Sequence, residues 1–317
     1  MRAVTEKQGS TAVTLPREGR LARLWKEIKA HKVSYLFVAP YGILFFLFTV
    51  LPVFVAICLS FTHYNMLQPP KWVGWENYLK LFLSDDVWLV AVKNTFIFAV
   101  ITGPLSYFAS FIFAWFINEL QPKIRAVLTL MLYAPSISGS LFMIWTVMFS
   151  GDAYGYINGF LLYWGIIKEP IQWLTDPSWM MPVVILVVLW MSLSTSFLAF
   201  IAGLQGLDPR LFEAGAVDGI RNRWQELFYI TLPQMKGYLM FGAIMSITGS
   251  FTAAAQIIPL VGFPSTDYAA HTIVAHLIDY GNVRFEMGTA SAIAVILFVV
   301  MVVVQRWVQR LLDRFGS

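Results

Sequence analysis

Six long apolar stretches constrain this chain more than any other feature of its sequence. They cover roughly residues 36–61, 90–117, 124–149, 181–203, 236–259 and 287–309. Each is long enough for a helix that crosses a bilayer, which takes ~20 residues. Only 13% of the residues are charged, whereas a soluble domain carries about 25%. The sequence therefore predicts an all-α integral membrane protein with six transmembrane helices.

The stretches also divide the chain. Residues 1–35 are expected to form a polar, basic cytoplasmic arm, residues 36–309 the membrane domain, and residues 310–317 a cytoplasmic tail. The apolar run at 36–61 is too long for a cleaved secretory signal, so it is interpreted as a retained first helix.

Basic residues predict which loops face the cytoplasm, because Lys and Arg gather on the inner side of a membrane. If the N-terminus lies inside, the inner segments hold most of the 22 Lys and Arg residues. The outer segments then hold only Lys71, Lys80, Lys93, Lys168 and Arg284. Both termini and the segment 204–236 are therefore expected to be cytoplasmic.

The positions of the acidic residues indicate whether transport by this chain could be driven by protons. All 18 Asp and Glu residues fall outside the predicted spans, with Glu119 and Glu286 closest. A carboxylate at the bilayer centre is costly and is kept mainly for proton or ion relays. Proton-coupled transport is therefore not expected. The chain also lacks the G-x-x-x-x-G-K-[ST] loop that binds ATP phosphates, so an ATP-driven process would need a separate ATPase chain.

Catalytic and metal sites are not expected. The single cysteine, Cys58, excludes a multi-cysteine metal site, and the four histidines are scattered. His271 and His276 are five residues apart, which separates them by about 140° on a helix. We expect these two side chains to form hydrogen bonds in an outer loop rather than bind a metal.

The inner segment 204–236 contains helix signals. Asp208 is suited to cap a helix N-terminus, and Pro209 to occupy its first position. Gly219 can end that helix in a left-handed conformation. A second helical stretch, residues 223–231, is expected to end before Pro233, because a residue that precedes proline avoids the α region. On these residues alone, a helix lying on lipid headgroups and a helix docking another protein both remain open.

The sequence Glu213-Ala214-Gly215-Ala216-Val217-Asp218-Gly219, followed by Ile230-Thr231-Leu232-Pro233, resembles the "EAA" loop of permease subunits of binding-protein-dependent ABC importers. Residues 73–78, Asn94-Thr95, Gly203-Leu204-Gln205 and Met287-Gly288 resemble further segments of the carbohydrate branch, typified by the maltose permease family. Two departures are Gly215, where alanine is usual, and one extra residue between Gly219 and Ile230.

The resemblance implies a type I importer permease fold in the inner membrane. It implies that the loop couples to an ATPase through Glu213, Ala214, Gly215, Asp218 and Gly219. The implied partners are a second, similar permease chain, two ATPase subunits that bind ATP and Mg²⁺, and an external solute-binding protein. The cargo would be a saccharide, with no role for nucleic acid and no cofactor in this chain.

The resemblance also implies a substrate path in the fourth and fifth spans. Its positions are Trp190, Ser192, Thr195, Ser246, Gly249 and Ser250. Gly249 offers no side chain to a sugar, so the site is expected to differ from that of the maltose permease. Small residues also allow membrane helices to pack closely, and that reading stays open here.

Three other functions remain as alternatives. A stand-alone channel or secondary transporter would need intramembrane charges or a filter-like loop. A membrane enzyme would need clustered His, Asp or Glu. A permease for a non-sugar solute such as a glycerol phosphate would favour basic residues in the cavity, and the spans supply almost none.

Overall fold

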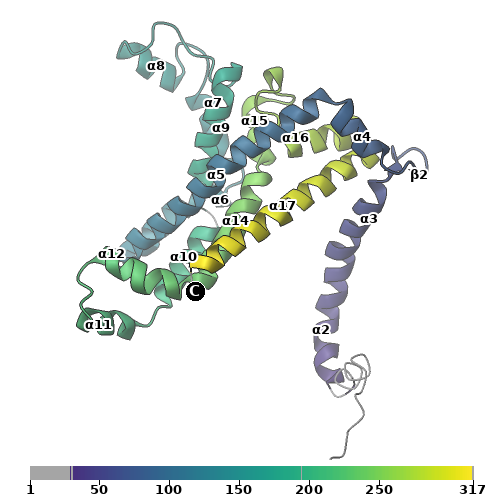
Figure 1. Ribbon diagram of the computed structural model, residues 1–317. Coiled ribbons are helices and arrows are strands. Elements are labelled where there is room, and N and C mark those ends of the chain that lie inside the picture. The colour runs from purple at the N-terminus through teal and green to yellow at the C-terminus, as the bar shows by residue number, and fades with distance from the viewer. Residues whose placement is uncertain (1–28, 30, 194, 316–317) are drawn as a thin grey trace, which may run out of the picture. The chain divides into compact units, whose positions relative to one another are not determined.

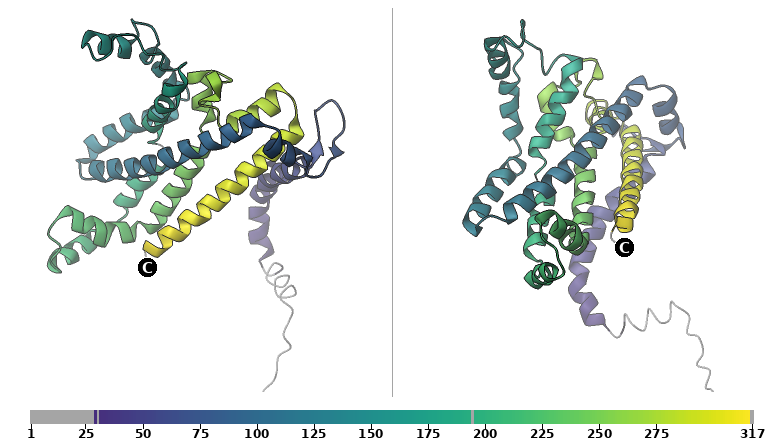
Figure 2. Two further views of the ribbon diagram at one scale, coloured as in Figure 1. Left: turned by 45° about the horizontal axis from the view of Figure 1, so that its top comes forward. Right: turned by 60° about the vertical axis from the view of Figure 1, so that its left-hand side comes forward.

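The computed structural model describes residues 29, 31–193 and 195–315, so most of the predicted N-terminal arm lies outside the described residues. The described chain is mostly helical. Its contacts divide it into two units, Met1–Val55 and Ala56–Ser317, which are treated separately below. Figures 1 and 2 show the helices in three orientations.

The first apolar stretch is one helical run. It consists of α2 (Lys32–Phe45), the π-helical turn η1 (Phe46–Val50) and α3 (Leu51–Leu59). The run has 28 residues and a mean hydropathy of 2.8, so it is long and apolar enough to cross a membrane. The π turn lies directly before Pro52, where a missing backbone N–H would interrupt an ordinary α-helix.

After α3, the second unit contains two short strands and a short helix. β1 (Thr62–His63) pairs antiparallel with β2 (Lys71–Trp72), and α4 (Glu76–Leu83) follows. The longer helices of the unit are α5 (Asp86–Asn118), α6 (Pro122–Ile137), α9 (Pro177–Met191), α10 (Thr195–Gln205), α14 (Lys236–Phe251) and α17 (Met287–Phe315). Helices α5, α10 and α14 pack against one another as its centre.

Short elements connect these helices. Between α6 and α9 lie η2 (Leu141–Met143), α7 (Ile144–Met148) and α8 (Tyr156–Tyr163). Between α10 and α14 lie α11 (Pro209–Val217), α12 (Arg223–Glu226), the π turn η3 (Leu227–Thr231) and α13 (Leu232–Gln234). After α14 come α15 (Ala254–Val261), η4 (Thr266–Tyr268), α16 (Ile273–Ile278) and the π turn η5 (Asp279–Val283).

Among the residues that the structure describes, four helical runs are long and apolar enough to cross a membrane: Lys32–Leu59, Asp86–Asn118, Pro177–Gln205 and Met287–Asp313. A fifth candidate is the bent pair formed by Pro122–Ile137 and Leu141–Met148. The predicted span 236–259 is divided between α14 and α15. With 16 residues, α14 is about 24 Å long, short of the ~30 Å hydrocarbon core. Six crossings therefore remain a prediction.

Three of the predicted spans are broken, which the apolar pattern did not show. The third bends by 84° after Ile137, where Ser138 leaves the helical conformation. The fourth is interrupted between Met191 and Thr195, and the fifth between Phe251 and Ala254. Hydroxyl residues lie at each break, and side chains of this kind bind their own backbone in competition with the helix.

Contacts between helix ends show which segments share a side of the second unit. Lys236 Nζ lies 3.4 Å from Asp313 Oδ1, and Arg223 Nε lies 3.5 Å from Glu119 Oε1. The segment 204–236 therefore lies near the ends of α5 and α17, as Figure 1 also shows for α11 and α12.

The opposite ends of α5 and α17 also have connecting contacts. The N–H of Gly288 donates to the Tyr64 carbonyl, and the Asn94 side chain donates to the His271 carbonyl. The start of α5, the two short strands and the segment 265–288 therefore share the other side. This alternation agrees with the predicted order of inner and outer segments.

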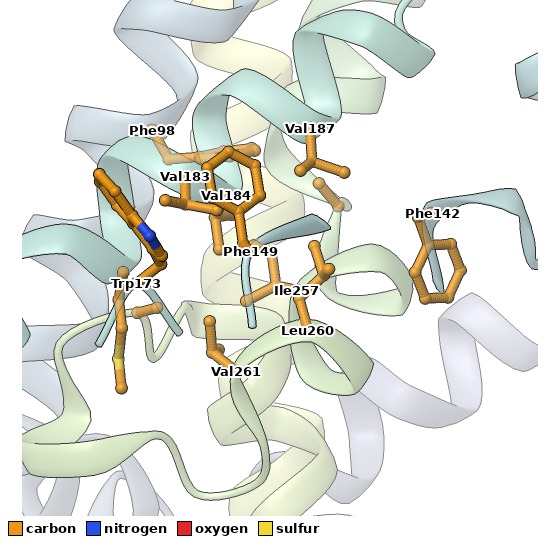
Figure 3. Close-up of a cluster of buried hydrophobic side chains, with 13 residues drawn as sticks. Phe98, Phe142, Phe149, Trp173, Val183, Val184, Val187, Ile257, Leu260 and Val261 are labelled. Carbon is orange, nitrogen blue, oxygen red and sulfur yellow. The ribbon is translucent and has the colours of Figure 1, made fainter. Parts of the chain in front are cut away.

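Buried apolar side chains form separate clusters along the second unit. Figure 3 shows the cluster in which Val183, Val184 and Val187 of α9 gather with Ile257 and Leu260 of α15. A second cluster joins the later part of α5 to α10 and the start of α14. A third joins α4, α16 and α17 to the start of α5. The stretch between the first two clusters contains a cavity.

Candidate functional site

A cavity of about 200 Å³ lies between the first two apolar clusters. Along α5, its lining residues Thr102 and Ser106 fall between Phe98 of one cluster and Phe111 of the other. The remaining lining residues come from four other helices: Ser136, Val188, Met191, Ser192, Met245, Ser246, Gly249, Ser250, Ala253 and Gln256. The cavity is thus a polar layer between two apolar ones.

All three helix breaks meet at this cavity. Ser136 lies at the end of α6, Ser192 lies at the break after α9, and Ala253 lies at the break before α15. Transporters commonly form their substrate sites from discontinuous membrane helices, since backbone freed at a break can be tolerated where it lines a cavity. The breaks therefore mark this cavity as the candidate site.

The structure brings together four of the six residues predicted for the substrate path. Ser192, Ser246, Gly249 and Ser250 all line the cavity. Gly249 has no heavy atom within 4 Å of the position that a β-carbon would take, so it faces open space.

Two predicted residues lie elsewhere. Trp190 is 39% exposed, and its ring packs edge-on against Trp145 with centroids 5.5 Å apart. Thr195 is exposed at the first turn of α10. The fourth span is interrupted between these two residues, which a continuous helix did not predict.

Sequence reasoning missed polar lining residues on two helices: Thr102 and Ser106 of α5, and Ser136 of α6. The resemblance to the maltose permease implied substrate-path positions only in the fourth and fifth spans. A usable signal was present in α5, where Thr102 and Ser106 are four residues apart and share one helix face.

Most hydroxyl groups of the lining donate to a carbonyl of their own helix. These bonds are Thr102 to Phe98 (2.8 Å), Ser106 to Gly103 (3.1 Å), Ser136 to Tyr133 (2.8 Å), Ser192 to Leu189 (2.6 Å) and Ser250 to Ser246 (2.6 Å). A hydroxyl whose proton is used in this way still offers lone pairs. The lining is therefore rich in hydrogen-bond acceptors.

The segment 204–236 forms the predicted short helix. Asp208 caps α11 by accepting from the N–H of Arg210 at 2.9 Å, and Pro209 is its first residue. Gly219 has a φ of 97° and ends the helix. The N–H of Ile220 donates to the Gly215 carbonyl at 2.9 Å, which completes a Schellman motif.

The five residues predicted to couple to an ATPase do not share one face. Glu213, Ala214, Asp218 and Gly219 are exposed, whereas Gly215 is buried. A β-carbon on Gly215 would lie 2.7 Å from Cδ1 of Ile230. The glycine that replaces the usual alanine therefore serves packing within the segment rather than approach by another protein.

The second helical stretch does not end before Pro233, so that prediction was wrong. The helix continues from Arg223 through η3 to Gln234, and Leu232 keeps helical angles (φ −60°, ψ −44°). The π turn widens the backbone directly ahead of Pro233, where the proline ring would collide with an ordinary α turn.

A cap forms near Arg221, where the resemblance predicted one extra residue. The Asn222 side chain accepts from the N–H of Gln225, and the Gln225 side chain accepts from the N–H of Arg221. This reciprocal pair is a variant of the capping box and fixes the start of α12.

Comparison with known proteins assigns the family. The profile described as "Binding-protein-dependent transport system inner membrane component" matches residues 119–315, which is more than half of the chain. The chain belongs to this family. It is accordingly a multi-pass inner-membrane protein and a permease component of a transport system.

Individual relatives agree with the family assignment. The probable ABC transporter permease protein YesP of Bacillus subtilis is 31% identical over 279 residues, which cover 86% of this chain and 88% of YesP. The lactose transport system permease protein LacF of Rhizobium radiobacter is 31% identical over 220 residues, 68% of this chain and 72% of LacF.

A solved structure agrees as well. A chain from a bacterial ABC transporter involved in the import of the acidic polysaccharide alginate is similar with a TM-score of 0.75 and 25% identity. The match covers 93% of this permease and all of that chain. The type I permease fold expected from the resemblance is thereby supported along nearly the whole permease.

A buried polar network links residues 271–280 to the start of α5. His271 Nε2 lies 3.3 Å from His276 Nδ1, and His276 Nε2 lies 2.9 Å from Asp85 Oδ2. The Tyr280 hydroxyl donates to the same Asp85 oxygen at 2.8 Å. The prediction that the two histidines form hydrogen bonds is confirmed, although His271 precedes α16 rather than sharing a helix with His276. Their place in an outer loop stays a prediction.

Burial sets the protonation of this network. It lowers the pKa of His271 to about 4, and it lowers the pKa of His276 even though Asp85 opposes the shift. Burial alone would raise the pKa of Asp85, but hydrogen bonds from Tyr280 and the Trp88 N–H, with His276 nearby, lower it. Both imidazoles are therefore neutral near pH 7 and join α16 to the start of α5.

Proposed function

We propose that this permease imports a neutral saccharide by alternating access, with energy supplied by ATPase subunits on its cytoplasmic side. It would pair with a second permease chain, and an external solute-binding protein would deliver the cargo. The segment 204–236 and both termini would face the cytoplasm, and the chain would cross the membrane six times. No bond of the cargo is made or broken.

The observation that carries this proposal is the cavity at the three helix breaks. A binding site for a small molecule combines apolar walls with placed polar groups, and this cavity combines Val188, Met191 and Met245 with several hydroxyl side chains. Its volume of about 200 Å³ is below the ~300 Å³ at which pockets for drug-sized ligands begin. A longer cargo would therefore need surface from the second permease chain.

The lining favours an uncharged cargo. None of its residues is Lys, Arg, Asp or Glu. A carboxylate or phosphate can only accept hydrogen bonds when ionised, and an acceptor-rich wall without a cation offers it little. The hydroxyls of a neutral saccharide can donate to such a wall. The cargo named for LacF, lactose, fits this chemistry better than the acidic alginate of the structural relative.

The exposed face of α11 supports the proposed coupling. Glu213, Ala214 and Val217 are exposed, and Val217 is 88% exposed. An apolar side chain this exposed, next to the small Ala214 and the carboxylate of Glu213, is suited to contact another protein. Arg223 and Glu119 join this segment to the end of α5, whose middle lines the cavity. A movement of the segment 204–236 can therefore be transmitted along α5 to the cavity.

Uptake by the assembled transporter in proteoliposomes, with ATP inside, tests the proposal. The probes are radiolabelled lactose, an arabinooligosaccharide, an alginate trisaccharide and glycerol 3-phosphate. We expect ATP-dependent uptake of a neutral saccharide, and Ser246→Phe should abolish it while assembly and basal ATPase activity persist. Uptake without ATP, or uptake restricted to the anionic probes, would overturn the proposal.

A further inference from the structure

One face of the short helix α8 exposes a row of aromatic side chains. Tyr156, Phe160, Tyr163 and Trp164 are between 60% and 84% exposed. Their spacing of four, three and one residues places them on one side of a helix. The rings also adjoin one another, with centroids 6.2 Å apart for Phe160 and Trp164 and 5.9 Å apart for Tyr163 and Trp164. These four side chains form one continuous surface, called the aromatic stripe below.

The opposite face of α8 holds the helix in place. Ile157 and Leu161 pack against the first apolar cluster. Between them lies Asn158, which is fully buried. Its amide donates to the Ile171 carbonyl at 3.0 Å, and its Oδ1 accepts from Trp173 Nε1 at 2.8 Å. The aromatic stripe is therefore directed away from the protein interior by a fixed set of contacts.

The sequence around the stripe is uncharged. Residues 153–167 contain no Lys, Arg, Asp or Glu, and the nearest charges are Asp152 and Lys168 at the two ends. Tyr and Trp combine an apolar ring with a polar tip, and they are enriched where a membrane meets water. An aromatic surface of this size needs a lasting cover. A delivery protein that leaves in every transport cycle does not provide one, whereas a bilayer does.

The position of α8 also suits a membrane surface. It follows α7, whose exposed Ile144 and Val147 belong to the fifth candidate span, and it precedes the span Pro177–Gln205. Figure 1 shows α8 beyond the end of α9 and running across its direction. A helix at a membrane surface lies in the membrane plane and therefore across the spans. Since the chain is a multi-pass membrane protein, lipid is present where these spans end.

We propose that α8 is an interfacial helix whose aromatic stripe inserts into the lipid headgroup region, on the membrane side opposite to the segment 204–236. The two lie at opposite ends of the run Pro177–Gln205. The apolar face of such a helix enters the boundary between headgroups and acyl chains by about 5–10 Å. The inference concerns how the permease contacts lipid, and it does not depend on the identity of the cargo.

A spin label on the stripe tests the contact with lipid. In a Cys58→Ser background, Tyr163→Cys gives a single labelling site in the assembled transporter, reconstituted in liposomes. Collisions of the label are measured with oxygen, which concentrates in lipid, and with a nickel chelate, which stays in water. We expect more collisions with oxygen than with nickel. Glu169→Cys is the matched control, because Glu169 is exposed in the same loop but lies outside the stripe, and its label should show the reverse order.

A charge on the stripe provides a second measurement. Phe160→Asp, combined with the label at residue 163, should raise the nickel collision rate several-fold, since a carboxylate is costly below the headgroups. Lys168→Asp changes a charge outside the stripe and should leave the label unaffected. An unchanged label profile in Phe160→Asp would show that the stripe does not hold α8 in lipid.

Two further results would overturn the inference. The label at residue 163 could be open to nickel in the resting transporter and become shielded when the solute-binding protein is added. The stripe would then be a docking face for that protein. Alternatively, the label could be shielded from both oxygen and nickel, which would place the stripe against another protein chain such as the second permease. Saccharide uptake can succeed or fail independently of these results, so the proposed function is tested separately.

Discussion

Gly215 of α11 lies against Ile230 of the following π turn, so close that a β-carbon on the glycine would be 2.7 Å from Ile230 Cδ1. Ile220 Cδ1 would be 3.0 Å from the same β-carbon. This contact holds α11 against the second helical stretch of the segment 204–236. The exposed face of α11 thereby has a fixed relation to the helix that leads into α14.

Enlarging Gly215 should separate these two helices. Gly215→Leu would overfill a buried contact, which costs about 1–3 kcal/mol, and α11 would shift. We expect ATP-dependent uptake to fall strongly while the permease still assembles. Gly215→Ala is the graded control: its β-carbon meets only the flexible ends of two isoleucines, so uptake should fall little. Equal uptake by the wild type and Gly215→Leu would show that this packing does not serve coupling.

The open space at Gly249 gives a second prediction. A phenylalanine there would project into the cavity, so Gly249→Phe should block uptake and leave the melting temperature nearly unchanged. Gly237 lies on the same helix and also has no atom within 4 Å of its β-carbon position, but it does not line the cavity. Gly237→Phe should transport normally. Uptake assays of both variants would reject the site if Gly249→Phe transported as well as its control.

The buried network of His271, His276 and Asp85 predicts a pH dependence of stability. In the unfolded chain a histidine takes up a proton near pH 6.5, whereas in the folded permease the pKa of His271 is about 4. Stability should therefore be full above pH 6.5 and be lost as the pH falls from about 6.5 to about 4. The slope is at most about 1.4 kcal/mol per pH unit for each such histidine.

Thermal unfolding of the purified permease in detergent at several pH values measures this effect. His271→Gln should make the loss shallower, because one of the two buried imidazoles is gone. A melting temperature independent of pH between 6.5 and 4 would contradict the neutral, buried assignment.

Close packing at the start of α17 predicts a sensitive glycine. A β-carbon on Gly288 would lie 2.0 Å from the Thr62 carbonyl oxygen, a backbone atom that cannot rotate away. Gly288→Ala should therefore destabilise the permease by about 1–3 kcal/mol. At Gly281 the added carbon would make an ordinary 3.5 Å contact with Ala290, so Gly281→Ala should be nearly neutral. Denaturation of both variants compares the two costs directly.

Local signals in the sequence predicted local structure well. The Asp208 cap, the Pro209 start and the left-handed Gly219 follow from short-range backbone chemistry and lie where they were expected. The apolar stretches predicted the positions of the long helices, because burial in a bilayer depends on composition more than on detailed packing.

Features that depend on tertiary packing were not predictable in the same way. The inward direction of Gly215 depends on Ile230, and the helix continues through Pro233 because a π turn precedes it. Likewise, the three breaks become a site only because α5, α9 and α14 bring them together. Thr102 and Gln256 belong to the cavity for that reason and not through any motif of their own.

The most direct test asks on which side of the membrane Glu213 lies and whether the ATPase covers it. Cys58 is the single cysteine, so a Cys58→Ser, Glu213→Cys permease carries one reporter thiol. Labelling with a membrane-impermeant maleimide would be compared in right-side-out and inside-out vesicles, with and without the ATPase subunits. We predict labelling only from the cytoplasmic side and protection by the ATPase. Labelling from the exterior, or undiminished labelling in the assembled transporter, would contradict it.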